Sequence, residues 1–151
     1  MKSPGVIVPP PLIYAAFFLA GMMLDSFVPI PIPAILTVRI IGWICALLSL
    51  VIAVSAFREF FIARTTIFPN RPVSSLITRG IFRISRNPLY LSLLCLYCGA
   101  ALFWSVWWAL IFAPLLVVVM NGYVIAREET YLVTAFGAEY REYCSRVRRW
   151  L

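Results

Sequence analysis

The stretch RISRNPLYLSLLCLYCGAALFWSVWWALIFAPLLVVVMNGYVIAREE, residues Arg83–Glu129, decides the fold of this chain. Its central run Pro88–Ala126 contains no charged residue, and charged groups stand at both ends. Because one membrane-spanning helix needs about 20 apolar residues, the run is long enough for two. The tryptophans near its middle are typical of a membrane–water boundary. We therefore predict a helical hairpin that turns near Phe103–Trp107.

The rest of the chain is almost as apolar as the hairpin. The 151 residues are 63% hydrophobic and 13% charged, and the mean hydropathy is +0.95. Two more apolar stretches precede the hairpin, at about Leu12–Ile30 and Ala34–Phe57. We predict an all-α polytopic membrane protein with four transmembrane helices and short cytoplasmic C-terminal helices.

The distribution of positive charge predicts the orientation of the chain. All 13 Lys and Arg residues except Arg39 lie at the N-terminus, within Arg58–Arg86, or in the last part of the chain from Arg127 on. Because basic residues collect in cytoplasmic loops, both termini and the long middle loop are expected in the cytoplasm. We predict an integral protein of a bacterial-type inner membrane, without a cleavable signal peptide. The net charge of +7 then reflects contact with anionic lipids rather than with nucleic acid.

The residue types present limit the chemistry. The chain has four cysteines and no histidine, and Cys95 and Cys98, although spaced as C-x-x-C, fall inside a predicted span. We expect these thiols to be small core residues and expect no metal site. Without histidine, any acid–base chemistry depends on carboxylates and tyrosines.

Local signals predict where the helices around the hairpin begin and end. Asn87 is expected to be the N-cap of a helix whose first residue is Pro88, and its free N–H groups would favour an anion. Gly137 is expected to end the helix that leaves the membrane. We also predict a basic amphipathic helix over Ala138–Leu151 and a short surface helix over Val73–Thr78.

Two polar clusters flank the hairpin, and each allows two interpretations. Glu128 and Glu129 either form ion pairs on a solvated helix surface, or one of them faces a pocket between helices. Adjacent helical residues point about 100° apart, so only one carboxylate is expected to face inward. The other cluster, Arg83, Arg86 and Tyr90, fits either positive-inside anchoring or ligand binding.

The ordered set of motifs resembles the integral-membrane methyltransferases, namely the isoprenylcysteine carboxyl methyltransferase and phospholipid methyltransferase families. The motifs are Leu76–Tyr90, the helical hairpin, Glu128-Glu129 and Phe136–Tyr143, and the resemblance covers about residues 64–150. It implies one methyltransferase domain over residues 1–151. Residues 1–63 would form two N-terminal spans, and residues 64–151 would form a cofactor loop, the hairpin and C-terminal cofactor-binding helices.

The resemblance also implies a function. Family members bind S-adenosylmethionine on the cytoplasmic side, and a lipophilic small molecule or lipid acceptor enters from the bilayer. The implied acceptor is isoprenylcysteine carboxylate-like or phospholipid amine-like. Glu128, Glu129 and Tyr90 are the implied catalytic candidates, and Arg83 and Arg127 the substrate-binding candidates. The implied cofactor-binding residues are Ser74, Ser75, Leu76, Ile77, Phe82, Asn87, Pro88, Leu89, Tyr90 and Glu128.

Two positions depart from the prenylcysteine pattern. Asn87 stands where those enzymes have histidine, and it is more similar to the phospholipid-amine branch. Val124 stands where they place an arginine beside the substrate carboxylate, one helical turn before Glu128. Arg127 is nearby in sequence but points to another side of the predicted helix.

Two other functional classes are compatible with the sequence. Membrane steroid and enoyl reductases have a similar C-terminal region, so a nicotinamide-dependent reductase is one alternative. A non-catalytic membrane scaffold or lipid-binding protein is the other. Cofactor selection separates the first alternative from a methyltransferase, and neutral substitutions at Asn87, Tyr90 and Glu128 would indicate the second.

Overall fold

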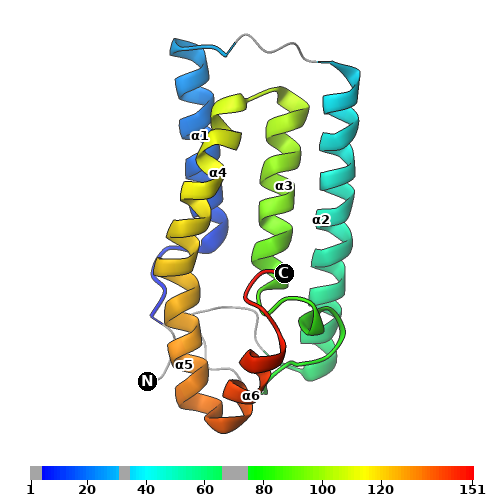
Figure 1. Ribbon diagram of the computed structural model, residues 1–151, viewed down its shortest axis with the longest axis vertical. Coiled ribbons are helices and arrows are strands. Elements are labelled where there is room, and N and C mark those ends of the chain that lie inside the picture. Colours follow the sequence, from blue (N-terminus) through cyan, green and yellow to red (C-terminus); the bar gives the residue numbers. More distant parts are fainter. Residues whose placement is uncertain (1–4, 31–34, 66–74) are drawn as a thin grey trace.

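The computed structural model describes residues 5–30, 35–65 and 75–151, and in these ranges the chain is a bundle of helices (Figure 1). Their order is α1 (Pro10–Phe27), α2 (Leu36–Ala63), the short 3-10 helix η1 (Gly80–Arg83), α3 (Pro88–Trp104), α4 (Trp107–Val119), the π-helix η2 (Met120–Ile125), α5 (Ala126–Phe136) and α6 (Ala138–Arg146). The predicted all-helical class is confirmed for this part of the chain.

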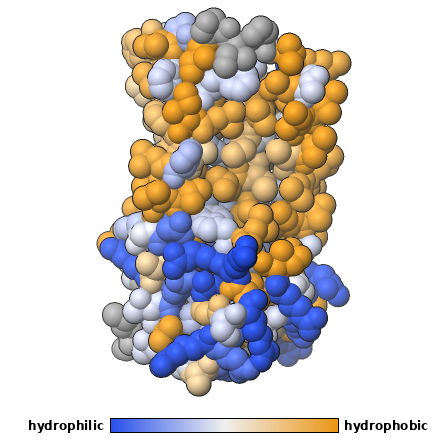
Figure 2. Space-filling model, viewed as in Figure 1, coloured by the Kyte–Doolittle hydropathy of each residue, from blue (hydrophilic) through white to orange (hydrophobic). Residues whose placement is uncertain are grey.

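Three helices are long and apolar enough to cross a membrane: α1, α2 and the continuous helix Trp107–Phe136, which joins α4, η2 and α5. α3 is also apolar, but at 17 residues it is shorter than these three. A fourth span therefore stays a prediction. Apolar side chains surround the long helices, and hydrophilic side chains gather at the end that contains α5 and α6 (Figure 2).

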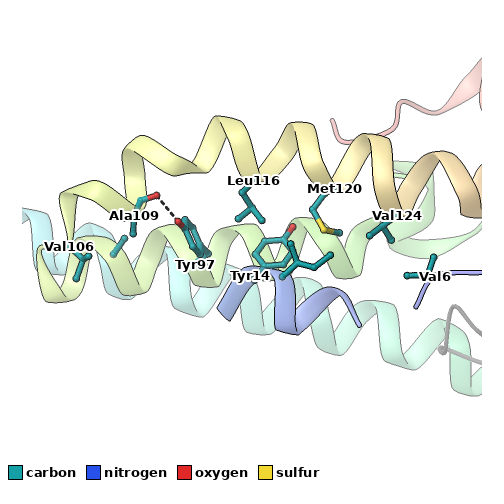
Figure 3. Packing of buried hydrophobic residues seen from close by; sticks show 10 residues of the cluster. Val6, Tyr14, Tyr97, Val106, Ala109, Leu116, Met120 and Val124 are labelled. Atoms are coloured by element: carbon teal, nitrogen blue, oxygen red, sulfur yellow. Dashed lines mark hydrogen bonds between the residues drawn. The ribbon is translucent and has the colours of Figure 1, made fainter. Parts of the chain in front are cut away.

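The predicted hairpin turn is confirmed. α3 ends at Trp104 and α4 begins at Trp107, with Ser105 between them in the left-handed region at φ 59°. The Tyr97 hydroxyl donates a hydrogen bond of 2.7 Å to the carbonyl of Ala109 across the hairpin (Figure 3). The core of the bundle continues along α4 and η2, where the side chains of Leu116, Met120 and Val124 are fully buried.

Glycines allow two pairs of helices to approach closely. A Cβ atom on Gly99 of α3 would lie 2.8 Å from the carbonyl oxygen of Gly42 on α2, and the reverse distance is also 2.8 Å. Similarly, a Cβ on Gly21 of α1 would lie 2.8 Å from the backbone nitrogen of Ala109 on α4. Membrane helices commonly pack through small residues of this kind, which let the two backbones approach closely.

We expect Gly99→Val to destabilise the protein by about 1–3 kcal/mol, because the new side chain would force α2 away from α3. The measurement is the thermal midpoint of the detergent-purified protein. Gly122→Val is the matched control, since a Cβ at Gly122 would meet no atom within 4 Å. Equal midpoints for the two variants would contradict this packing.

Two local predictions are wrong. The helix expected over Ala138–Leu151 ends at Arg146, and Val147 has extended backbone with φ −126° and ψ 132°. Val147 is buried, and the backbone after it bonds to the segment before α3, so tertiary contacts replace the helix. The helix expected over Val73–Thr78 is also absent from its described part, Ser75–Thr78, because Ile77 packs into an apolar cluster and the chain turns helical only at η1. Val73 lies outside the described residues.

Candidate functional site

The two polar clusters of the sequence meet at the hydrophilic end of the bundle. The connection carries η1 and leads into the start of α3, while α5, α6 and the last residues of the chain come from the other side (Figure 1). The following residues belong to this region, which we call the polar end.

Tyr90 and Glu128 are in direct contact. Tyr90 lies in the first turn of α3, and its hydroxyl donates a hydrogen bond of 2.6 Å to Oε1 of Glu128 on α5. The backbone carbonyl of Tyr90 also accepts a hydrogen bond of 2.9 Å from the hydroxyl of Tyr14 on α1. Three helices thus fix the position of this tyrosine, and Glu128 is the carboxylate that faces another helix.

Glu129 instead forms ion pairs. Its carboxylate lies 3.1 Å from Nη1 of Arg86 and 2.5 Å from Nη2 of Arg149. The side chains of Arg86 and Glu129 are 14% and 19% exposed, so this pair is mostly shielded from solvent. The hydrogen bond to Glu129 raises the pKa of Arg149. The two carboxylates therefore differ in environment: Glu129 forms ion pairs that are shielded from solvent, and Glu128 is turned toward Tyr90 on α3.

The α3 N-terminus is fastened to the C-terminal tail, by which we mean Val147–Leu151. Asn87 precedes α3 as predicted, but its side chain does not cap the helix. Its Nδ2 donates instead to the backbone carbonyl of Arg149 at 2.9 Å. The same carbonyl accepts a hydrogen bond of 3.3 Å from Ser85, a fully buried residue. Asn87 is therefore the N-cap by position, as predicted, but its side chain bonds to the tail and not to the first turn of the helix.

The remaining cofactor-binding candidates form an apolar cluster beside these contacts. Ser74 lies outside the described residues, and the hydroxyl of Ser75 donates to the carbonyl of Ala63 at 3.2 Å. Ile77 and Phe82 are buried, with Leu76 and Leu89 packed against the same cluster. Pro88 is fully buried at the start of α3.

The C-terminal helix closes this apolar cluster. The hydroxyl of Tyr143 on α6 donates a hydrogen bond of 2.6 Å to the backbone carbonyl of Phe82. Burial raises the pKa of Tyr143, which keeps the phenol protonated as a donor. Tyr140 on α6 is buried in the cluster as well. The candidates therefore occupy two adjoining environments, one apolar around Phe82 and one polar around Tyr90 and Glu128.

Arg83 and Arg127, the substrate-binding candidates, are both exposed. The guanidinium of Arg127 lies 4.4 Å from the centre of the Tyr123 ring, and its Nη1 is 3.4 Å from the carbonyl oxygen of Gly5. These contacts direct Arg127 toward the N-terminal segment. Val124 is fully buried in the bundle core.

Sequence interpretation missed a buried carboxylate on α2. Glu59 is only 4% exposed, and its oxygens lie 3.0 Å from Nε of Arg79 and 3.3 Å from Nη1 of Arg58. Gly80 has φ 57°, and a Cβ there would lie 2.6 Å from Oε1 of Glu59. Glu59 therefore holds the connection before η1 against α2. The available signal was a single acid among the basic residues at the end of an apolar stretch.

We expect Glu59→Ala to lower the free energy of unfolding by about 1–3 kcal/mol, because it removes hydrogen bonds to charged groups and leaves a cavity beside Gly80. Thermal unfolding in detergent measures this effect. The control is Glu139→Ala, which removes an exposed carboxylate from α6. A Glu59→Ala midpoint as high as that of the control would show that Glu59 does not fasten this segment.

The C-terminal tail contains a second contact that the sequence did not indicate. The indole Nε1 of Trp150 donates a hydrogen bond of 3.0 Å to Oδ1 of Asn121 in η2. π-helical turns inside α-helices occur frequently at functional sites. Here the π-helix presents a polar side chain within an apolar helix, and the tail supplies its partner.

Known proteins are similar to this chain in sequence. The family model for phospholipid methyltransferases matches residues 37–139, a range that includes Tyr90 and Glu128. The chain is 45% identical over 67 residues to an uncharacterized protein of Haemophilus influenzae, an alignment that covers 42% of this chain and 100% of that protein. No solved structure matches the chain. Proteins of the phospholipid methyltransferase family are methyltransferases that use S-adenosylmethionine. The family match spans more than half of the sequence, and the chain belongs to the phospholipid methyltransferase family.

Proposed function

We propose that this protein transfers a methyl group from S-adenosylmethionine to a lipophilic acceptor where the membrane meets the cytoplasm. Family membership supports the reaction type. The observation that carries the proposal for this chain is the 2.6 Å hydrogen bond between Tyr90 and Glu128, which joins the two polar clusters into one site.

The residues present suit the chemical groups of this cofactor. Its ammonium and ribose hydroxyl groups are donors that a carboxylate such as Glu128 accepts well, and its sulfonium favours a nearby negative charge. The adenine ring is flat and largely apolar, as is the cluster around Ile77 and Phe82. When bound, S-adenosylmethionine supplies an activated methyl group, so the protein contributes mainly orientation, worth about 7–11 kcal/mol in favourable cases.

Glu128 is the strongest candidate for any proton transfer. An amine acceptor must lose a proton, and Glu128, Glu129 and Tyr90 are the candidates for accepting it. Glu129 is engaged by two guanidinium groups, which occupy its oxygens. The hydrogen bond that Glu128 accepts comes from a neutral phenol, so Glu128 is better placed to exchange that contact for a ligand.

The acceptor that we propose is an amine-bearing lipid rather than a prenylated carboxylate. Recognition of a carboxylate favours a guanidinium near the reacting group. Val124 occupies the position at which the prenylcysteine enzymes place it, and Val124 is fully buried in an apolar core. Arg127 is turned toward Tyr123 and Gly5.

We also propose that the polar end faces the cytoplasm. Arg58 lies near the end of α2, and Arg79 and Arg86 come from the segment between α2 and α3. A second group of arginines, Arg141, Arg146, Arg148 and Arg149, comes from α6 and the tail. Both groups of arginines therefore lie at the end at which Figure 2 shows hydrophilic side chains. A lipid acceptor would then approach from the apolar surface above this end.

Titration calorimetry of the detergent-purified protein tests the proposed cofactor. We expect S-adenosylhomocysteine to bind with a stoichiometry of about one and NADPH to produce no heat beyond dilution. Binding of NADPH without binding of S-adenosylhomocysteine would favour a reductase. Binding of neither compound would contradict the proposed function and favour a non-catalytic membrane protein.

A further inference from the structure

We propose that Arg149 of the C-terminal tail is a positioning residue, which directs Glu128 toward Tyr90 by holding the neighbouring Glu129. This inference rests on the proposed function, because it concerns the same site. Arg149 itself touches neither Tyr90 nor Glu128 in any contact that the structure gives, so its influence has to pass through Glu129.

The first step is the strength of the Arg149–Glu129 contact. Two nitrogens of Arg149 bond to the two oxygens of Glu129, Nε at 3.1 Å and Nη2 at 2.5 Å. A paired arrangement of this kind fixes the direction of a carboxylate as well as its distance. The Glu129 side chain is 19% exposed, so solvent screens this contact less than it would a pair on an open surface.

The second step is the geometry of α5. Side chains of adjacent helical residues differ by about 100° in direction, so fixing Glu129 on one side fixes the direction of Glu128. α5 follows directly on the π-helix η2, where the regular hydrogen-bond spacing of the helix is interrupted. The rotation of α5 about its axis is therefore set by contacts along α5. Among these contacts, the Glu129 ion pairs join fully charged groups.

The third step is that Arg149 does not act alone on this helix. Arg86 also pairs with Glu129, at 3.1 Å, and comes from the segment that leads into α3 and Tyr90. The contacts Arg86–Glu129 and Tyr90–Glu128 are thus two parallel links between the same two segments. Arg149 adds a third link, from a part of the chain that lies beyond the family match at residues 37–139.

The tail is anchored well enough to serve this purpose. The carbonyl of Arg148 accepts a hydrogen bond of 3.0 Å from the backbone N–H of Arg86, and the carbonyl of Arg149 accepts one of 2.9 Å from Asn87. Beyond it, Trp150 bonds to Asn121 on η2. Arg149 is therefore held on both sides, and its guanidinium stands at a defined position next to α5.

A double-mutant cycle distinguishes positioning from general fastening. We measure the dissociation constant of S-adenosylhomocysteine for the wild type, Arg149→Ala, Tyr90→Phe and the double variant. Each single variant is expected to bind about tenfold more weakly. If Arg149 acts through the Glu128–Tyr90 contact, adding Tyr90→Phe to Arg149→Ala should weaken binding by less than about threefold. Full additivity of the two effects would overturn the inference.

Three further variants complete the experiment. Arg148→Ala is the matched control, because the Arg148 side chain is exposed and its backbone contact is kept; it should bind as the wild type does. Arg149→Lys retains the charge but not the paired arrangement, so it should recover only part of the lost affinity. If Arg149→Ala does not fold, Arg149→Gln takes its place in the cycle. Loss of affinity in Arg148→Ala equal to that in Arg149→Ala would contradict a specific role for Arg149.

The wild type separates this inference from the proposed function. Failure of the wild type to bind S-adenosylhomocysteine contradicts the proposed function and the inference with it. Binding by the wild type, together with unchanged binding by Arg149→Ala or Arg149→Gln, contradicts the inference alone.

Discussion

Glu128→Ala is expected to weaken the binding of S-adenosylhomocysteine by about 10- to 100-fold, which corresponds to loss of a hydrogen bond to a charged group. The variant removes the carboxylate that would accept hydrogen bonds from the ligand. It also deprives the Tyr90 hydroxyl of its partner at 2.6 Å, so a second group of the site loses its orientation. Calorimetry gives the dissociation constant, and methyl transfer to membrane lipids gives the rate.

Two comparisons separate the charge of Glu128 from its shape and from the folding of the protein. Glu128→Gln keeps the shape and one oxygen acceptor but removes the charge, so it should retain more affinity than Glu128→Ala. If transfer to an amine needs a base, Glu128→Gln should still lose methyl transfer by about 100-fold or more. Wild-type affinity in Glu128→Ala, with the protein folded by its thermal midpoint, would show that Glu128 is not part of the cofactor site.

The apolar pattern of the sequence was sufficient to predict the helical architecture. Apolar runs and the uncharged segment Pro88–Ala126 predict helices without tertiary information, because a chain in a membrane must satisfy its backbone hydrogen bonds internally. The turn near Phe103–Trp107 and the start of α3 at Pro88 follow from short local signals, and both lie where the pattern indicated. The existence of a fourth span depends on α3, whose length alone does not decide it.

The tail could not be predicted from the sequence because its structure depends on distant residues. Tyr140, Tyr143 and Val147 share a helical spacing, yet the helix ends at Arg146. Burial of Val147 and the hydrogen bonds from Asn87 and Arg86 stabilise an extended backbone there. The same tail carbonyl receives the side-chain amide of Asn87, a contact that no local pattern indicates.

The site was predictable in its residue types but not in its pairing. The sequence indicated that only one of Glu128 and Glu129 would face inward, and helix geometry alone cannot say which one. The π-helix η2 shifts the register of α5 relative to α4, and no residue pattern in the sequence predicts that shift. Glu59 was missed for a related reason, since its burial depends on the connection that folds back over it at Gly80.

Deletion of Arg149–Leu151 is expected to destabilise the protein by about 3–5 kcal/mol and to reduce binding of S-adenosylhomocysteine. The deletion removes the bonds of Arg149 to Glu129 and the backbone acceptor of Asn87 and Ser85. It also removes Trp150, which is partly buried against the bundle core and bonds to Asn121. The thermal midpoint in detergent and the dissociation constant should change together.

Deletion of Leu151 alone is the matched control for this truncation. Leu151 is 66% exposed, so its removal should leave both quantities close to wild type. The tail contacts join the α3 N-terminus, α5 and η2, three segments that are far apart in sequence and whose mutual position defines the site. A truncated protein with the stability and affinity of the Leu151 deletion would show that packing of the long helices already fixes that position, and that the tail only covers it.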